Sequence, residues 1–162
     1  MSRTALTTIA GVRTSVRGMS AAEDEAVGIL QDLIRCESVN DGTGRGKGER
    51  QAAEYVAEKL EEVGVHAEIF ESAPNRASVV ARIPGADPTR DALLIHHHLD
   101  VVPAEPKEWT YDPFAAELAD GCVWGRGAID MLDMNAMTLA IPVSFPAAIL
   151  PGFEPEANVA RL

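Results

Sequence analysis

The chain has 162 residues, of which 46% are apolar and 24% are charged, a balance typical of a soluble globular domain. The 25 acidic and 14 basic side chains give a net charge of -11, which argues against a nucleic-acid-binding protein, because such proteins need a basic face to contact phosphates. No apolar run approaches the roughly 18 residues needed to span a bilayer. The two cysteines lie far apart and are too few for a disulfide framework, so we expect a cytoplasmic protein.

The N-terminal segment 1–19 differs in composition from the rest of the chain. It carries three arginines, no acidic residue and several Ser and Thr residues. This composition is typical of an organelle transit peptide. The alternative is that Met19 is the true initiator, because signals for folded structure begin directly after it. On either interpretation we expect residues 1–19 to be a flexible extension.

The sequence from Ser20 to Arg35 predicts an amphipathic helix. Residues Ser20–Glu23 form a capping box, in which side chains satisfy the free N–H groups at a helix start. Apolar residues then recur at helical spacing, so one face is expected to be buried: Val27, Leu30, Leu33 and Ile34.

A second helix is predicted over Glu49–Val63, after a polar loop over residues 36–48 that holds four glycines. Gly64 supplies the left-handed residue that commonly ends a helix. The apolar face of this helix consists of Ala53, Val56, Leu60 and Val63.

Three strands are predicted next. Residues Val65–Ile69 alternate between apolar and polar side chains, as in a strand with one buried face. Residues Ser78–Ile83 form a short β-branched run. Residues Ala92–Ile95 are a continuous apolar run, typical of a strand covered on both faces. With a further helix predicted from Asp130 to Ala140, this order of elements predicts an α/β fold with a mixed sheet flanked by helices.

The segment 141–162 has neither helical nor strand periodicity. It contains four prolines, each of which removes a main-chain donor, so we expect no regular helix to continue past Ala140. The segment is therefore predicted to be an irregular Pro-rich tail. It is either an extended segment docked on the domain or sequence that was never selected to fold there. The four prolines are Pro142, Pro146, Pro151 and Pro155.

The first motif with evident chemistry is the run His96–Asp100 at the end of the predicted apolar strand. His98 and Asp100 are two residues apart, so they point to the same side of an extended chain. A neutral imidazole is a good zinc ligand, and a neighbouring carboxylate can accept its other N–H and fix the tautomer. Ligands of open α/β sheets bind beyond the carboxyl ends of strands. The alternative is a surface histidine cluster that binds stray metal without function.

The second motif is Gly125–Asp130, which follows the short apolar run Cys122–Trp124. The two glycines flank Arg126 and allow a tight main-chain path. Asp130 then stands at the start of the predicted helix, where the helix dipole favours negative charge. A carboxylate held there can bridge two cations, or it can be an N-cap aspartate with no chemical role.

Taken together, these motifs resemble those of one family. The sequence reads HLDVVP from His98, WTYDPF from Trp109 and DGCVWGRGAIDM from Asp120. This ordered set is similar to that of the co-catalytic zinc peptidases and deacylases, which include aminoacylase, acetylornithine deacetylase, succinyl-diaminopimelate desuccinylase and glutamate carboxypeptidase. The resemblance covers residues 20–140.

The resemblance implies roles for three residues. His98 would ligate a first zinc ion, and Asp130 would bridge two zinc ions. Asp100 would be the catalytic carboxylate, which positions the groups that react. A metal-bound water would attack an amide carbon, with a downstream glutamate as general base. The implied cofactor is zinc, as one or two ions, with cobalt as a substitute. The implied substrates are small peptides or N-acyl amino acids.

Three residues depart from the pattern of the family. His97 stands where relatives usually have glycine, Leu132 replaces a common lysine or glycine, and Asn135 sits where close relatives often carry an acid. We expect none of the three to contact His98 or Asp130 directly. Each should therefore tune the site rather than abolish it.

The resemblance also implies that part of the site is missing. Family members are more than twice as long, and their Glu-Glu pair, which holds the general base and a ligand of the second zinc, follows the segment where this chain ends. The two acids after Ala140, Glu154 and Glu156, do not form that pair. With His98 and Asp130 as the anchored ligands, helped at most by the neighbouring histidines, we expect weak zinc binding. A frameshift near residue 140 would explain the loss of pattern.

The expected domain is thus α/β, an incomplete zinc-exopeptidase-like catalytic domain over residues 20–140. Two functions fit it: a zinc-dependent metallopeptidase, carboxypeptidase or deacylase of amide bonds, and a catalytically inactive truncated fragment. A histidine-rich metal-storage module is a third class. We expect no nucleic-acid or membrane partner, and we expect self-association through an unpaired sheet edge.

Overall fold

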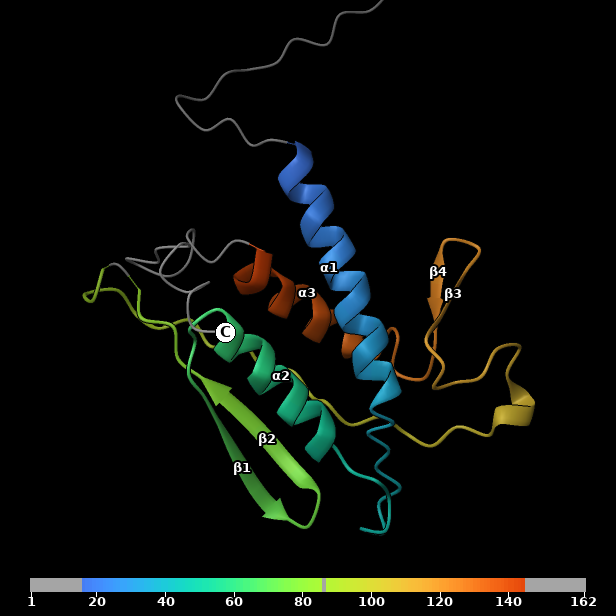
Figure 1. The fold of residues 1–162 in the computed structure, drawn as a ribbon. Helices are drawn as coiled ribbons and strands as arrows, with labels where there is room; N and C mark the ends of the chain where they lie inside the picture. The colour runs from blue at the N-terminus through green and yellow to red at the C-terminus, as the bar shows by residue number, and fades with distance from the viewer. Residues whose placement is uncertain (1–15, 86, 145–162) are drawn as a thin grey trace, which may run out of the picture.

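A computed structural model describes the main chain of residues 16–85 and 87–144, and their side chains from residue 22 onward. This part of the chain holds three α-helices and two separate two-stranded antiparallel sheets (Figure 1). The mixture of α and β elements is as predicted. The described residues do not, however, form the single central sheet that we expected. None of their helices is long and apolar enough to cross a membrane.

Helix α1 (Val16–Arg35) supplies a large share of the core through Ile29, Leu33 and Ile34, each at most 1% exposed. The helix begins before Ser20, so the predicted start at the capping box is wrong. Serine and glutamate are tolerated inside helices at a small cost, and the motif therefore does not stop the helix from extending toward the N-terminus. The helix also enters the segment that we expected to be flexible.

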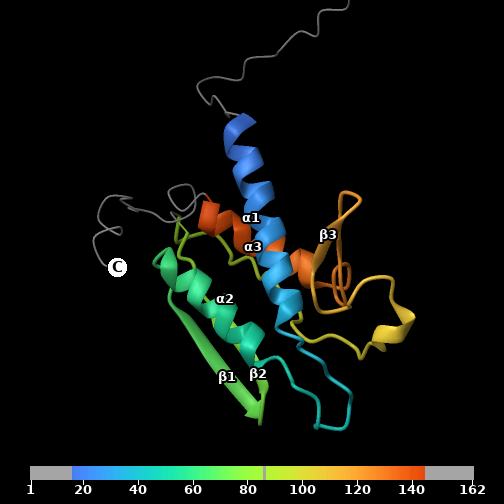
Figure 2. The ribbon, with the colours of Figure 1, turned by 45° about the vertical axis from the view of Figure 1, so that its right-hand side comes forward.

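Helix α2 (Arg50–Glu62) confirms the second predicted helix, with Val63 as its C-cap and Gly64 in the left-handed region at φ 78°. It lies along the hairpin of β1 (Ala67–Ala73) and β2 (Arg76–Ala81), as Figures 1 and 2 show. In β1 the predicted alternation is present, because Ala67 and Ile69 are half-buried and their neighbours are exposed. The first two predicted strands are therefore confirmed, with shifted bounds.

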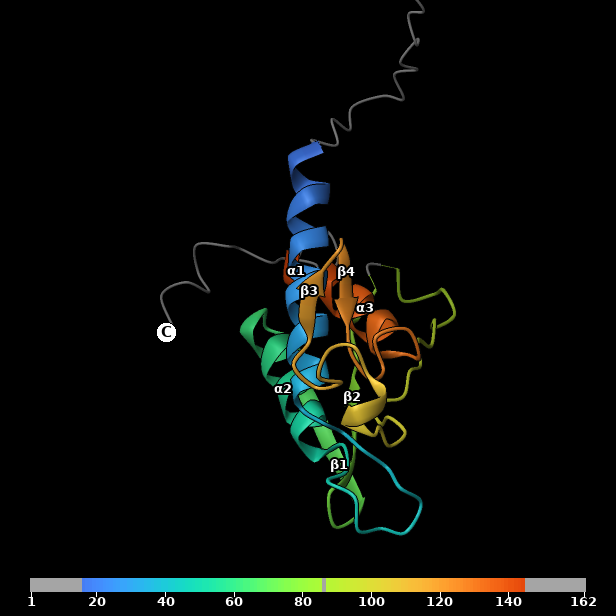
Figure 3. The ribbon, with the colours of Figure 1, turned by 90° about the vertical axis from the view of Figure 1, so that its right-hand side faces the viewer.

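Helix α3 (Leu132–Ser144) packs against α1 (Figure 3). It runs through Pro142, so the prediction that no regular helix continues past Ala140 is wrong. Proline removes one main-chain donor and disfavours a helix, but packing supplies most of the stability of helices in proteins. Here Pro142 is itself buried, as are Leu139 and Ala140 before it. The remaining prolines of the tail lie outside the described residues. Four residues of α3 pack into the core: Leu132, Ala136, Leu139 and Ala140.

The predicted central strand over Ala92–Ile95 is wrong. Residues 91–98 are assigned to no strand and form no main-chain hydrogen bond to another main-chain group of the described residues. Leu93 and Leu94 are 86% and 85% exposed instead of buried. An apolar run becomes a covered strand only when neighbouring strands pair with it, and the described residues place none there. The run instead borders a groove of about 810 Å³ between β2 and α3.

A second hairpin, of β3 (Glu117–Ala119) and β4 (Cys122–Trp124), follows a short 3-10 helix, η1 (Pro106–Glu108). In Figures 1 and 2 this hairpin lies on the other side of α1 from α2 and the first hairpin. The chain passes from it directly into the Gly125–Asp130 motif.

Candidate metal centre

The segment 98–101 is held in place by a parallel bridge between Val39 and Val101. The buried Ser38 hydroxyl donates to the Leu99 carbonyl at 2.6 Å, and the Val101 amide donates to the Ser38 carbonyl at 2.9 Å. Leu99 and Val101 are buried, so the residues that alternate with them, His98 and Asp100, point away from the core. This is the arrangement that the two-residue spacing predicted.

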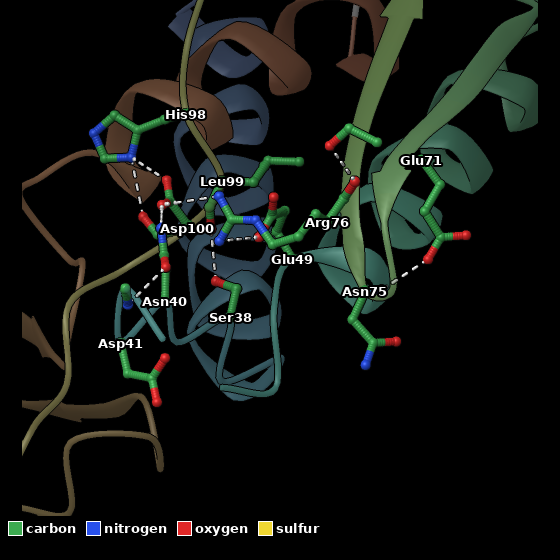
Figure 4. A network of polar contacts seen from close by, with 12 residues as sticks. Ser38, Asn40, Asp41, Glu49, Glu71, Asn75, Arg76, His98, Leu99 and Asp100 are labelled. Atoms are coloured by element: carbon green, nitrogen blue, oxygen red, sulfur yellow. Dashed lines mark hydrogen bonds and ion pairs between the residues drawn. The ribbon is translucent and has the colours of Figure 1, made fainter. Parts of the chain in front are cut away.

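The side chain of His98 faces Asp100 through its Nδ1 atom (Figure 4). Nδ1 lies 3.0 Å from the Asp100 carbonyl oxygen and 3.3 Å from the carboxylate atom Oδ1. The other carboxylate oxygen, Oδ2, accepts a hydrogen bond from Asn40 Nδ2 at 2.7 Å. Asp100 is thus fixed on one side by Asn40 and faces the imidazole on the other. Such a neighbour favours the tautomer with its proton on Nδ1, which leaves Nε2 free to bind a cation.

The loop that carries Asp130 lies against the 98–101 segment at Gly127 and against α1 at Gly125, because the two glycines permit a close approach. A Cβ atom at Gly127 would lie 2.5 Å from Val101 Cγ1, and a Cβ atom at Gly125 would lie 2.7 Å from Ile34 Cγ2. Gly127 also adopts φ 84°, a conformation that other residues rarely take. The tight main-chain path predicted for this motif is therefore confirmed.

The two motifs meet at His98 and Asp130. Nε2 of His98 lies 3.2 Å from Oδ1 of Asp130, and the two side chains are 44% and 90% exposed. Two ligands bound to one tetrahedral zinc ion at about 2.0–2.2 Å are themselves roughly 3.3–3.6 Å apart. The donor pair therefore fits a shared ion with little movement, and its exposure gives an ion access.

The hydrogen-bond chemistry of His98 points the same way. Nδ1 faces the main-chain carbonyl oxygen of Asp100, which only accepts, and Nε2 faces Oδ1 of Asp130, which only accepts when that carboxylate is ionised. A neutral imidazole has one N–H and satisfies only one of them. A second proton or a bound cation on Nε2 satisfies the other.

A third protein ligand is absent from the described residues. They contain no cluster of three His, Cys, Asp or Glu side chains that could hold a metal ion. His97 faces α3 instead, where its Nε2 atom lies 3.5 Å from Thr138 Oγ1. His96 borders the groove between β2 and α3 and does not line the cleft that contains Asp130. Neither His96 nor His97 is therefore placed to act as the additional zinc ligand that the sequence suggested.

Asn135 corrects a further expectation. Its Nδ2 atom donates to the His98 carbonyl at 2.8 Å and to the Met131 carbonyl at 3.0 Å. The prediction that this residue does not contact the presumed ligands is therefore wrong, since the contact is to the main chain of His98. The amide bridges the two halves of the centre, because Met131 follows Asp130 directly.

Sequence reasoning also missed an arginine and a glutamate behind Asp100. Arg76 Nη2 lies 3.8 Å from Asp100 Oδ2, and Arg76 Nη1 lies 3.2 Å from Oε2 of the buried Glu49 (Figure 4). This Oε2 atom is buried and lies within ion-pair distance of Arg76, but it accepts no hydrogen bond. Burial therefore raises the pKa of Glu49, although the charge of Arg76 lowers it. The only sequence signal was position, because Glu49 precedes α2 and Arg76 begins β2.

A cleft of about 450 Å³ opens beside the His98–Asp130 pair. Its lining includes Trp109 from the motif WTYDPF, and Trp124 and Arg126 from the motif that also holds Asp130. The three motifs thus meet around one cavity, large enough for a small organic molecule.

Comparison with known proteins agrees with these motifs. The sequence pattern of the family described as peptidase family M20/M25/M40 matches residues 94–151. Succinyl-diaminopimelate desuccinylase from Methylorubrum populi is 36% identical over 129 residues, which are 76% of this chain and 31% of that protein. The desuccinylase from Methylobacterium radiotolerans is 38% identical over 128 residues, and aminoacylase-1 from Sus scrofa is 31% identical over 110 residues. These matches cover 76% and 67% of this chain and 30% and 26% of the two relatives, so the chain spans less than a third of their length.

Proposed function

Because the chain belongs to peptidase family M20/M25/M40, we propose that it carries part of the zinc site of a metal-dependent amide hydrolase. The observation that supports this most directly is the 3.2 Å separation of His98 Nε2 and Asp130 Oδ1. The substrates we propose are N-acyl amino acids and small peptides, in line with the names desuccinylase and aminoacylase of the relatives.

Each residue of the site has a proposed role. His98 and Asp130 would hold zinc, and Asp100 would orient the imidazole through Nδ1 while Asn40 keeps its carboxylate in place. When bound, zinc would polarise the amide carbonyl and make a coordinated water acidic. Asn135 joins the two ligand-bearing segments, so it would keep their spacing during turnover.

A chain with two anchored ligands binds zinc more weakly than a complete site, which needs three or four. The described residues also place no carboxylate other than Asp100 and Asp130 in the cleft that could act as general base. Loss of a general base typically lowers the rate by roughly 10²–10⁴-fold. A catalytically inactive, zinc-binding chain is therefore the second candidate, and activity separates the two.

The test is hydrolysis of N-acyl amino acids and dipeptides by the purified chain with added zinc or cobalt. Turnover that a chelator and Asp130→Ala both abolish, and that the exposed-acid control Asp91→Ala leaves intact, would establish the hydrolase. Absence of turnover together with zinc binding that depends on Asp130 would establish the inactive zinc-binding chain.

Metal storage by histidines alone makes a different prediction. Binding would then survive Asp130→Ala but would be lost when His96, His97 and His98 are all replaced by alanine. The structure gives this class little support, because the side chains of His96 and His97 lie away from the Asp130 cleft. A cytoplasmic location and self-association through a sheet edge stay predictions.

A further inference from the structure

Among the residues that the structure describes, Arg126 is the only arginine or lysine that lines the cleft beside His98 and Asp130. Its main-chain amide donates to the Pro113 carbonyl at 2.7 Å, which fixes the backbone. Its guanidinium carbon lies 5.0 Å from the centroid of the Trp109 ring. The ring therefore covers one face of the guanidinium and leaves its Nη donors available.

These donors have no protein partner among the described residues. The Nε atom of Arg126 is buried without a hydrogen bond, and no described ion pair includes this side chain. The two acids that line the same cleft, Asp100 and Asp130, face His98 instead. Nε has almost no accessible surface, so a ligand in the cleft would pair with the two Nη atoms, which have no hydrogen bond or ion pair among the described residues.

The chemistry of the guanidinium selects the ligand. Arginine presents its donors as a rigid planar fork that matches a carboxylate in a bidentate arrangement, and stacking on an aromatic ring holds the fork in one orientation. The chain as a whole carries a net charge of -11, so an anion finds few other attractive positions on it. The apolar part of the lining, Trp109, Val123 and Trp124, suits the uncharged part of a small molecule.

We infer that Arg126, held by Trp109, binds the free carboxylate of an N-acyl amino acid in this cleft. This inference rests on the proposed function for the identity of the substrate, but the anion site itself does not need zinc. Arg126 would thereby act as a specificity-determining residue that prefers acids to uncharged amides.

The experiment compares two matched probes, N-acetylglycine and N-acetylglycinamide, in the presence of a chelator. Both tryptophans of the chain line the cleft, so tryptophan fluorescence reports binding. We expect the acid to bind at least about 10-fold more tightly than the amide, as for a hydrogen bond to a charged group. We expect Arg126→Gln to abolish that preference and Arg126→Lys to keep only part of it, because lysine lacks the planar fork. The control variant is Arg90→Gln, an exposed arginine outside the cleft.

Equal binding of the two probes to the unaltered chain would overturn the inference, as would an acid preference that survives Arg126→Gln. If Arg126→Gln does not fold by circular dichroism, Arg126→Lys decides, because an unreduced preference in that variant contradicts bidentate recognition. The outcome is separable from the zinc proposal. A chain that binds N-acetylglycine in chelator but fails to bind zinc refutes only the proposed function, and one that binds zinc without acid preference refutes only this inference.

Discussion

Replacing Gly127 by alanine tests how the two ligand-bearing segments are brought together. The added Cβ would lie 2.5 Å from Val101 Cγ1 and 2.9 Å from Leu132 Cδ1, and both of these side chains are buried. The residue also has φ 84°, where a side chain is strained. The strain costs about 1–2 kcal/mol, and the overpacking adds roughly 1–3 kcal/mol. We therefore expect the free energy of unfolding to fall by about 2–5 kcal/mol.

The matched control is Gly121→Ala in the β3–β4 turn. Gly121 has a similar φ of 75°, but a Cβ atom there would meet nothing within 4 Å. Both variants share the strain and the reduced entropy of the unfolded chain, so the difference between them isolates the close approach. Urea denaturation followed by circular dichroism measures both. We expect Gly127→Ala to be less stable than Gly121→Ala by about 1–3 kcal/mol.

The same pair of variants carries a prediction for the metal centre. Pushing the 125–131 loop away from Val101 separates Asp130 from His98, so zinc affinity should fall in Gly127→Ala and stay unchanged in Gly121→Ala. Equal stability and equal zinc affinity of the two variants would refute the reasoning that close packing of this loop sets the position of Asp130.

Three further variants test the supports of the site. Ser38→Ala removes the buried 2.6 Å hydrogen bond to the Leu99 carbonyl, so urea denaturation should show that the free energy of unfolding falls by about 1–2 kcal/mol. The control Ser78→Ala changes an exposed serine and should lower it by less than about 0.5 kcal/mol. Equal losses in the two variants would contradict a role for the hydrogen bond. Burial raises the pKa of Glu49, so its contribution to stability is fully present below the unfolded pKa and is lost as pH rises through the folded value. In the unaltered chain the free energy of unfolding should therefore fall as pH rises above about 4.3, and denaturation at several pH values should show a smaller fall in Glu49→Gln. The same pH dependence in both proteins would contradict a free-energy cost of ionising the buried Glu49 carboxyl. Asn135→Asp places a carboxylate against the His98 carbonyl, and calorimetric unfolding should show a lower melting temperature than for Asn135→Gln, which keeps a donor; the opposite order would show that the 2.8 Å bond has no role.

Local patterns predicted much of the fold. The apolar spacing located α2 and its end at Gly64, and the alternation from Val65 to Ile69 located β1. These features depend on residues close together in sequence, so composition and periodicity are sufficient. The passage of α3 through Pro142 was missed because packing of this helix against α1 outweighs the local stop signal. The start of α1 at Val16 was missed because the residues of the capping box are also tolerated inside a helix.

The covered strand over Ala92–Ile95 failed for a different reason. An apolar run predicts that a segment tends to be buried, but a strand is buried only when other strands or helices cover it. Among the described residues no strand pairs with Ala92–Ile95. The predicted central sheet is wrong for the same reason, and Leu93 and Leu94 are left exposed.

The relative positions of His98, Asp100 and Asp130 were predicted better than the sheet, and their roles stay predictions. The two-residue spacing placed His98 beside Asp100, and the resemblance paired His98 with Asp130, which the structure brings to 3.2 Å. The supporting contacts of Asn40, Arg76 and Asn135 carry no local signal, because each joins segments far apart in the sequence. Only the folded chain shows that these polar side chains contact the segments that carry His98 and Asp130.

The central claim is that His98 and Asp130 share one ion, and a double-mutant cycle of zinc affinity measured by calorimetry tests it most directly. The cycle uses the unaltered chain, His98→Ala, Asp130→Ala and the double variant, with His66→Ala as the control for an exposed histidine elsewhere. A shared ion predicts that each single change weakens binding nearly as much as both together, with no effect of His66→Ala. Full zinc affinity in Asp130→Ala, or effects of the two changes that simply add, would contradict a shared metal centre.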